Sequence, residues 1–276
     1  MGVSGWQHVG ESDGTSTFQL ESWSRFFDFL EAEIFSYSGP QRRSFIWRGQ
    51  RRANWSLSTT LDRLLEVVGI SDGPQDALED VSKQHLERFK YASRGRRGLS
   101  PAALSENEWW SLGQHFGLAT PLLDWTRAPF AALYFAFEDA SVGNVPRAIY
   151  ALNENAVFAK ELEIQNGPSI EKGRVPIVEI VDPMSDENQR LVSQGGCFTR
   201  APIGTPIEQW VQRAFEGSSD PILIRIEIPD TDRLGCLQAL NRMNINHLSL
   251  FPDLSGASRS TNLRLEFEHC TVRKNA

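Results

Sequence analysis

The segment LGQHFGLATPLLDWT, residues 112–126, concentrates side chains that can bind a ligand or carry a proton. Pro121 stiffens the backbone, and we expect Leu122 and Leu123 to face the core, so the segment is held rigidly. Polar side chains are then presented from a fixed frame: Gln114, His115, Thr120, Asp124 and Thr126. We interpret the segment as a connection between two helices that forms one wall of a binding pocket.

Asp124 and Trp125 stand directly before an apolar helical sequence. We predict that Asp124 is buried, which requires several hydrogen-bond donors or an arginine partner. The Trp125 ring could stack on a ligand, but a core position is the favoured interpretation.

A second candidate is the sequence FIWRGQ, residues 45–50, which predicts a short buried strand that ends in Arg48 and Gly49. An isolated buried charge is costly, so Arg48 needs a partner. Two interpretations stay open: a salt bridge to Asp124 or Glu138, or contact with an anionic group of a ligand. Gly49 would let a ligand or another backbone come close.

A third candidate is NQRLVSQGGCFT, residues 188–199, in which Arg190 and Gln194 lie four residues apart on one face of a predicted short helix. Gly195 and Gly196 then end the helix. The segment is either an ordinary helix C-terminus or a further contributor to the pocket.

Composition limits the possible functions. The chain has 276 residues and a net charge of −7, so the whole molecule does not attract polyanions. Its cationic residues are 23 Arg and only 5 Lys, and arginine suits bidentate binding of phosphate. A cluster at Arg94, Arg96 and Arg97 is a candidate contact for nucleic acid, although a solvated loop is the favoured reading.

Several classes of protein and site find no support in the sequence. There is no apolar run long enough for a transmembrane helix and no recognisable signal peptide. Three scattered cysteines, Cys197, Cys236 and Cys270, read as reduced thiols, so we expect a cytoplasmic location. No histidine or cysteine spacing fits a metal site, and no P-loop or dinucleotide fingerprint occurs.

Hydrophobic periodicity predicts an α+β fold: a mixed sheet with several surrounding helices in one compact domain. Residues 1–17, rich in Gly and Ser, are expected to be flexible, and residues 18–276 to form a single domain. Strands are predicted at 44–50, 147–152, 174–181, 221–228 and 263–268, and helices at 22–35, 58–69, 77–93, 105–117, 126–140, 186–193, 206–216, 230–242 and near 253–257.

The three stretches together resemble the FRG domain, which is named for a Phe-Arg-Gly motif. The opening motif is matched by Arg48, Gly49, Gln50, Trp55, Leu57 and Arg63, and the second signature by Gln114, His115, Gly117, Thr120, Leu122, Leu123, Asp124, Trp125 and Thr126. The core resemblance covers residues 44–138. Trp47 replaces the naming Phe, and Pro121 replaces the usual Arg, which removes one cation from the expected pocket.

The resemblance implies a bacterial or phage-related setting and a role as a toxin or in phage defence. By analogy with ADP-ribosyltransferases, one hypothesis is an enzyme that uses NAD and has an ADP-ribosyltransferase-like fold. Arg48 would hold a phosphate or ribose, His115 or Thr126 would orient the nicotinamide ribose, and Gln194 or Glu227 would support an oxocarbenium-like centre. Further ligand-binding candidates are Gly49, Gln50, Gln114, Thr120, Asp124 and Arg190.

Two other hypotheses stay open. The first is a non-catalytic module that senses a nucleotide, a nucleic acid or a phage protein through Arg48 and the arginines at 94–97. The second, which the sequence supports least, is a metal-dependent hydrolase or nuclease that uses Asp124.

Overall fold

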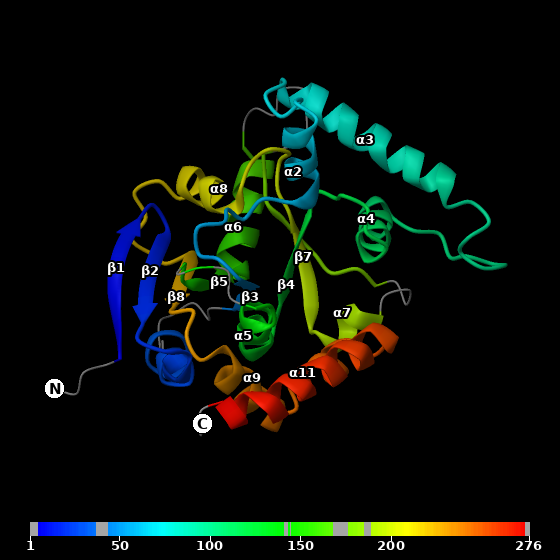
Figure 1. The fold of residues 1–276 in the computed structure, drawn as a ribbon. Helices are drawn as coiled ribbons and strands as arrows, with labels where there is room; N and C mark the ends of the chain where they lie inside the picture. Colours follow the sequence, from blue (N-terminus) through cyan, green and yellow to red (C-terminus); the bar gives the residue numbers. More distant parts are fainter. Residues whose placement is uncertain are drawn as a thin grey trace.

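The computed structural model describes residues 5–36, 44–140, 143, 145–167, 176–184 and 189–273. Within them the chain forms an α+β fold around one mixed sheet of eight strands in the order β1-β2-β8-β5-β3-β4-β7-β6 (Figure 1). Only β2 and β8 pair in parallel; the other neighbouring strands are antiparallel. The strands are β1 (Trp6–Ser12), β2 (Thr15–Leu20), β3 (Phe45–Gln50), β4 (Leu122–Thr126), β5 (Arg147–Asn153), β6 (Glu179–Val181), β7 (Gly196–Arg200) and β8 (Leu223–Ile228).

The helices lie on both sides of this sheet. The first helical segment starts as a 3-10 turn at Trp23–Arg25 and continues through α1 (Phe26–Phe29) into a π-helical stretch at Leu30–Phe35. The others are α2 (Thr60–Val67), α3 (Gln75–Ala92), α4 (Glu106–His115), α5 (Pro129–Phe137), α6 (Glu154–Gln165), α7 (Gln189–Ser193), α8 (Ile207–Ala214), α9 (Arg233–Arg242), α10 (His247–Leu250) and α11 (Leu254–Arg273).

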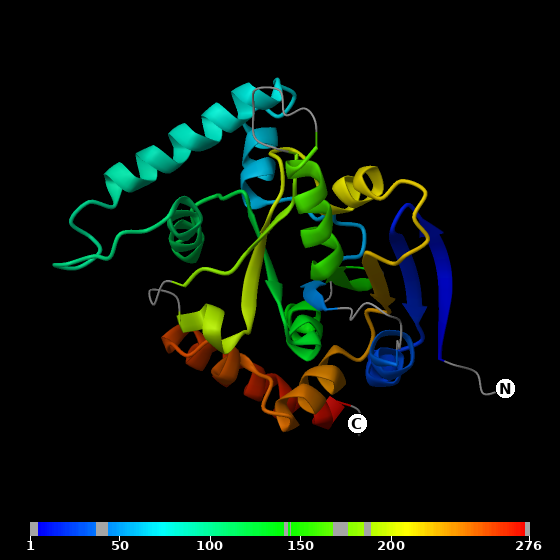
Figure 2. The ribbon, with the colours of Figure 1, turned by 180° about the vertical axis from the view of Figure 1, so that it is seen from behind.

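The sheet separates two hydrophobic cores. On one face α5 is almost wholly buried, as its continuous apolar sequence predicts, and packs with α1, α9 and α11. The other face is covered by α6 and α8. In both Figures 1 and 2, α5, α9 and α11 gather below the sheet, whereas α6 and α8 lie in the upper half. The strands that carry the candidate site, β3 and β4, lie in the middle of this arrangement.

β3 and β4 are neighbours in the sheet, yet among the described residues they share one ladder pair, Trp47 with Thr126. β3 pairs with β5 along its whole length, and β4 pairs likewise with β7. Beyond Trp47 the sheet therefore opens between Arg48–Gln50 and the earlier residues of β4. Backbone groups at this opening lack a strand partner and are available to side chains.

Three sequence-based expectations about secondary structure are wrong. The first concerns residues 1–17, expected to be flexible, which instead supply β1 and the start of β2. Apolar packing and strand pairing explain the order: Trp6 and the following Phe18 pack against the core, and β2 hydrogen-bonds to β8. Asp13 and Gly14 form the tight turn with positive φ angles of 46° and 75°, which Asp-Gly favours between two strands.

The second wrong expectation concerns residues 122–126, interpreted as a turn between helices, which form the buried strand β4. The third concerns residues 263–268, predicted as a strand, which lie inside α11. Leu263 and Phe267, four residues apart, face the core, while Leu265 is exposed. The apparent alternation therefore coincides with a helical period.

Two elements differ in extent. The strand predicted at 174–181 is described only from residue 176, and its ladder covers Glu179–Val181; its first two residues lie outside the described ranges, as do residues 186–188 of a predicted helix. Helix α6 was not predicted. Its N-terminus is capped by Asn153, whose side chain accepts a hydrogen bond from the Ala156 amide.

Candidate ligand-binding site

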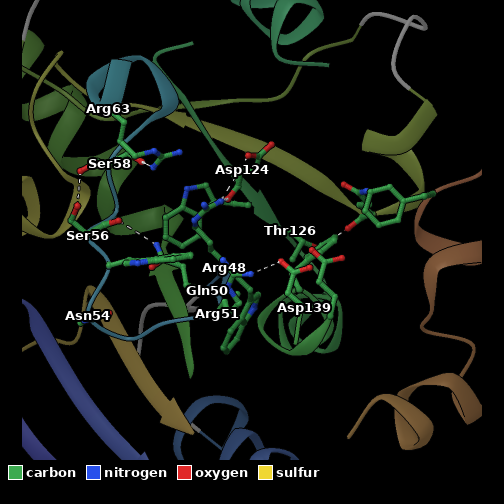
Figure 3. A pocket seen from close by; sticks show the side chains of 18 of the residues that line it. Arg48, Gln50, Arg51, Asn54, Ser56, Ser58, Arg63, Asp124, Thr126 and Asp139 are labelled. Carbon is green, nitrogen blue, oxygen red and sulfur yellow. Dashed lines mark hydrogen bonds and ion pairs between the residues drawn. The ribbon is translucent and has the colours of Figure 1, made fainter. Parts of the chain in front are cut away.

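A pocket of about 790 Å³ lies at the opening between β3 and β4. Its walls come from both strands, from the segment after β3, from α2, and from the C-terminal end of α5 (Figure 3). The residues that line it are Trp47, Arg48, Gly49, Gln50, Arg51, Asn54, Trp55, Ser56, Ser58, Arg63, Glu66, Asp124, Trp125, Thr126, Phe135, Glu138, Asp139, Gln194 and Phe251.

Arg48 occupies the opening in the sheet. Its Nη1 donates a hydrogen bond of 2.8 Å to the backbone oxygen of Asp124 and lies 3.9 Å from the carboxylate of the same residue. Its Nε is buried and has no hydrogen-bond partner among the described residues. Burial lowers the pKa of the Arg48 guanidinium, while Asp124 opposes this effect. The ion pair is long, so Arg48 keeps donor capacity for a ligand.

The segment at 112–126 holds Asp124 in place through a chain of side chains. The hydroxyl of Thr120 donates to Oε1 of Gln114, and Nε2 of Gln114 donates a 2.7 Å bond to the Asp124 carboxylate. Thr120 is itself buried. The Asp124 carboxylate, expected to be buried, is instead exposed, with 66% of its side-chain surface accessible. Thr120 and Gln114 thus act on the pocket through Asp124.

Two further arginines surround the same space. Arg51 forms a 3.2 Å ion pair with Asp139, and its Nε is buried without a hydrogen-bond partner in the described structure. Arg63, on α2, donates 2.9 Å to the Ser58 carbonyl (Figure 3). The exposed Trp55 ring lies 5.3 Å from the Arg51 guanidinium carbon, within cation–π range. One side of the pocket is therefore cationic and partly aromatic.

Gln50 contributes an amide from the end of β3. Its side chain is almost fully buried, with 6% of the residue exposed. Nε2 makes a long contact of 3.4 Å with the Ser56 carbonyl, and the buried Oε1 has no partner among the described residues. Because buried polar atoms are almost always satisfied, this oxygen is a candidate ligand contact.

Two acidic side chains, Glu138 and Asp139, reach the pocket from the end of α5. Arg147 donates to the Ala136 carbonyl at 2.5 Å and to the Asp139 carbonyl at 3.1 Å. Arg233 donates to the Phe137 and Glu138 carbonyls at 3.0 and 2.6 Å. These two arginines satisfy carbonyl groups that a helix end leaves unpaired. They fix the backbone that carries the two acidic side chains.

Gln194 reaches the pocket next to Thr126. The Thr126 hydroxyl donates a 2.5 Å bond to the Gln194 carbonyl and accepts one from the Ala128 amide. The Gln194 amide itself donates to the Leu250 carbonyl at 3.1 Å. Thr126 therefore joins β4 to the turn after α7, and the helix predicted to start at residue 126 starts after Ala128 instead.

Gly49 lines the pocket, but its close neighbour is α5. A Cβ atom on Gly49 would lie 1.9 Å from the Ala132 carbonyl oxygen. The glycine therefore permits the approach of another backbone, one of the two alternatives that the sequence left open.

Five predicted site residues do not line the pocket: Gln114 and Thr120, which act through Asp124, and Arg190, His115 and Glu227. Arg190 pairs with Asp253 through Nε at 2.6 Å, and His115 lies near that pair, where burial and then Arg190 lower the pKa of the imidazole. Glu227 contacts Arg225 in its own strand and accepts a 2.9 Å hydrogen bond from Gln19. Of the three candidates Arg48, His115 and Gln194, the first and third therefore line the pocket, and His115 does not.

The arginines at 94–97 also lie outside the pocket. Arg94 donates to the Tyr91 carbonyl at 3.2 Å, Arg96 to the Ala92 carbonyl at 2.9 Å, and Arg97 to the Ala102 carbonyl at 2.9 Å. Arg94 and Arg96 contact carbonyls at the end of α3, Arg97 contacts the loop that follows, and contact of the three with nucleic acid stays a prediction.

Cysteine and metal chemistry have little structural support in the described residues. Burial raises the pKa of Cys197 to about 12, which disfavours a nucleophilic thiolate. No group of three or more potential ligands among His, Cys, Asp and Glu is placed to hold a metal ion in the part of the chain that is described. Nor does any helix there combine the length and apolar character needed to cross a membrane.

Sequence reasoning missed much of the pocket. Trp55 and Arg63 belong to the motif that was recognised at 48–63, and their spacing was a usable signal. Arg51 was visible only as one member of an arginine-rich stretch. Glu138 was named only as an alternative salt-bridge partner of Arg48, and Asp139 was not named; the anchoring of α5 by Arg147 and Arg233, which places both at the pocket, leaves no local signal.

Comparison with known protein families gives one match: the FRG domain model matches residues 43–144. This range contains β3, β4 and α5, and with them most of the residues that line the pocket. No curated protein and no solved structure matches the chain.

Proposed function

We propose that the pocket, most of which lies within residues 43–144 that the FRG domain model matches, binds a nucleotide, with NAD as the substrate. The protein would then act as an ADP-ribosyltransferase-like enzyme that breaks the bond between nicotinamide and ribose. Its acceptor would be a protein, a nucleic acid or water.

The observation that carries this proposal is the set of donors on one side of a roomy pocket. Arg48 and Arg51 each have a buried Nε without a partner among the described residues, and Arg63 lines the same wall. Guanidinium groups bind phosphate oxygens through paired, charge-assisted hydrogen bonds. A pyrophosphate would satisfy these donors, and the exposed Trp55 ring would offer a stacking surface for a base.

The acidic side of the pocket supports the reaction. As the glycosidic bond breaks, positive charge develops on the ribose, and nearby carboxylates stabilise that charge. Glu138 and Asp139 line the same pocket as the arginines, and Asp139 lies 3.2 Å from Arg51. A dinucleotide bound with its pyrophosphate at Arg48 would place a ribose toward these carboxylates.

The biological role that fits the FRG domain and such an activity is that of a bacterial toxin or a phage-defence protein. Expression in a bacterial host tests this role. We expect the wild type to slow growth and Arg48→Ala to relieve the effect while the protein remains soluble. Equal growth of hosts that carry the wild type and Arg48→Ala would count against the role.

The biochemical test is NAD binding and nicotinamide release by the purified full chain. We expect Arg48→Met, which keeps the length of the side chain, to weaken NAD binding about 10- to 100-fold, since hydrogen bonds to charged groups contribute about 1.5–3 kcal/mol. Arg213→Met, at an exposed position on α8, is the matched control and should bind like wild type. Absence of both binding and nicotinamide release at millimolar NAD would overturn the proposal.

The alternative function is a non-catalytic nucleotide sensor. The same pocket would serve it, because the arginine side suffices for binding. Salt-dependent binding of NAD or ADP-ribose that requires Arg48 but releases no nicotinamide would favour the sensor over the enzyme.

A further inference from the structure

Glu138 is an unusual residue for the end of a helix. It lies one residue beyond α5, lines the pocket, and keeps only 19% of its side-chain surface accessible. Its Oε2 is buried and accepts no hydrogen bond from any described residue. A carboxylate in this state needs a strong structural or chemical reason, since burial without donors is unfavourable.

The backbone at Glu138 is held so firmly that the side chain cannot easily relax away. Arg233 donates to the Glu138 carbonyl at 2.6 Å and to the preceding carbonyl at 3.0 Å. Arg147, wholly buried, holds the carbonyl of the next residue, Asp139. The position of the carboxylate is thus set from both β5 and α9.

A second buried pair lies behind the carboxylate. Nε2 of His247, on α10, is 3.7 Å from Oε2 of Glu138 and has no hydrogen-bond partner among the described residues. Its Nδ1 contacts the hydroxyl of Tyr134, one turn before Glu138 on α5. When the Tyr134 hydroxyl donates to Nδ1, the neutral imidazole carries its proton on Nε2, which faces the carboxylate.

We infer that Glu138 is the catalytic base of this pocket and that His247 and Tyr134 are positioning residues that hold its carboxylate. The inference rests on the proposed function, because it names the group that would activate the acceptor in ADP-ribosyl transfer. It assigns the carboxylate of this site to Glu138 and not to Glu227, which was expected, as an alternative to Gln194, to support an oxocarbenium-like centre but lies outside the pocket.

The proposed step transfers the ribose carbon from nicotinamide to the acceptor oxygen. The bond between the ribose carbon and the nicotinamide nitrogen breaks, and neutral nicotinamide leaves with the bonding electron pair. The oxygen of the acceptor hydroxyl, or of water, forms the new bond to the same carbon. Its proton passes to the Glu138 carboxylate and then to solvent. No oxidation or reduction occurs.

The surroundings of Glu138 suit a base that works near neutrality. Burial and the neighbouring Asp139 raise the pKa of Glu138 from 4.5 to about 7, against the opposing effect of nearby arginines. A base with a pKa near the working pH is the most effective. The ionisable groups that face it or act on it are Tyr134, Asp139, Arg51, Arg233, His247 and Arg259.

The first test is Glu138→Gln, with nicotinamide release and NAD binding measured on the full chain. We expect NAD binding within about threefold of wild type and a loss of at least about 100-fold in kcat, the usual effect of removing a general base. Glu163→Gln, on the exposed side of α6, is the control and should behave as wild type. The wild-type rate should rise with pH to a plateau, with a midpoint near the pKa of about 7.

The second test addresses the positioning residues. Tyr134→Phe keeps the ring but removes the hydroxyl, so the Nε2 proton of His247 is no longer enforced. We expect about a tenfold loss in kcat, an unchanged KM and a shift of the pH midpoint to higher pH. His247→Gln replaces the Nε2–H donor with an amide N–H, so this variant should keep most of the wild-type rate. A purely structural role would lower the melting temperature and leave the midpoint in place.

The outcomes separate the two proposals. A wild type that binds no NAD and releases no nicotinamide contradicts the proposed function. A wild type that releases nicotinamide, together with a folded Glu138→Gln of equal rate, contradicts the assignment of Glu138 alone. A pH midpoint unchanged in Tyr134→Phe contradicts the positioning role of Tyr134 and His247.

Discussion

Gly49 and Ala132 bring β3 and α5 into backbone contact: a Cβ atom on Gly49 would lie 1.9 Å from the Ala132 carbonyl oxygen and 2.6 Å from the Ala136 amide nitrogen. Neither atom can rotate away, because both belong to the helix backbone. Arg48 and Gly49 therefore have different roles. Arg48 lies in the pocket, and Gly49 brings the helix that carries the acidic side of the pocket close to the strand that carries the cationic side.

Gly49→Ala is expected to lower the free energy of unfolding by about 3 kcal/mol, since overpacking against fixed backbone is among the larger single-residue effects. Chemical denaturation of the purified variant measures it. Gly10→Ala is the matched control, because a Cβ there meets nothing within 4 Å. If Gly49→Ala is as stable as that control, the close approach of α5 is not as described.

Gln114→Ala should weaken ligand binding without unfolding the chain. The amide of Gln114 connects buried Thr120 to the Asp124 carboxylate, which lies beside Arg48. Loss of this hydrogen bond to a charged group corresponds to about 2 kcal/mol, so we expect a Kd about tenfold higher or more. Titration with NAD measures the change, and Gln212→Ala on α8 is the control for an exposed glutamine. Unchanged affinity would mean that Asp124 does not orient Arg48.

Arg147 and Asp230 form a buried ion pair of 2.6 Å, with side-chain exposures of 0% and 6%. Arg147→Met removes the guanidinium from this buried ion pair and frees the end of α5. We expect a destabilisation of about 3–5 kcal/mol. Asp230→Leu in the same background should recover part of it, because the buried carboxylate that lost the guanidinium is removed. Denaturation of the two single variants and the double variant gives the coupling between the residues. If the destabilisations of the two single variants simply add in the double variant, the two residues are not coupled, which would contradict the ion pair.

The sequence revealed the fold class and most elements because long apolar periods and capping residues are local signals. Ser105 and Glu108 form the capping box that their spacing predicts, and α5 is buried on nearly every side. The N-terminal hairpin was missed although Asp13 and Gly14 carry a recognisable hairpin signal. The bias toward Gly and Ser in residues 1–17 outweighed that signal in the prediction.

The candidate site was only half predictable. Arg48, Asp124 and Thr126 lie in contiguous motifs, so the cationic strand end could be found from residue order alone. Glu138 was named only as an alternative salt-bridge partner of Arg48, because its surroundings come from Arg233, His247 and Arg259, about a hundred residues later in the chain. Such long-range contacts leave no periodic pattern that one sequence can show.

Glu138 should also make stability depend on pH. Below about pH 4.5 the carboxyl is protonated in both folded and unfolded chains and contributes no difference. Between about 4.5 and 7 the unfolded chain loses the proton while the folded chain retains it, so the free energy of unfolding falls as pH rises. Above about pH 7 the full penalty, about 3 kcal/mol at roughly 1.4 kcal/mol per pKa unit, is present.

Glu138→Gln removes this ionisation. We therefore expect the variant to be more stable than wild type by up to about 3 kcal/mol at pH 8 and equally stable near pH 4.5. Denaturation at the two pH values measures the difference, with Glu163→Gln as the exposed control. A variant that gains stability while losing catalytic turnover is the behaviour of a residue kept for function at the expense of folding. The same pH dependence in Glu138→Gln and wild type would contradict the buried, unpartnered state of this carboxylate.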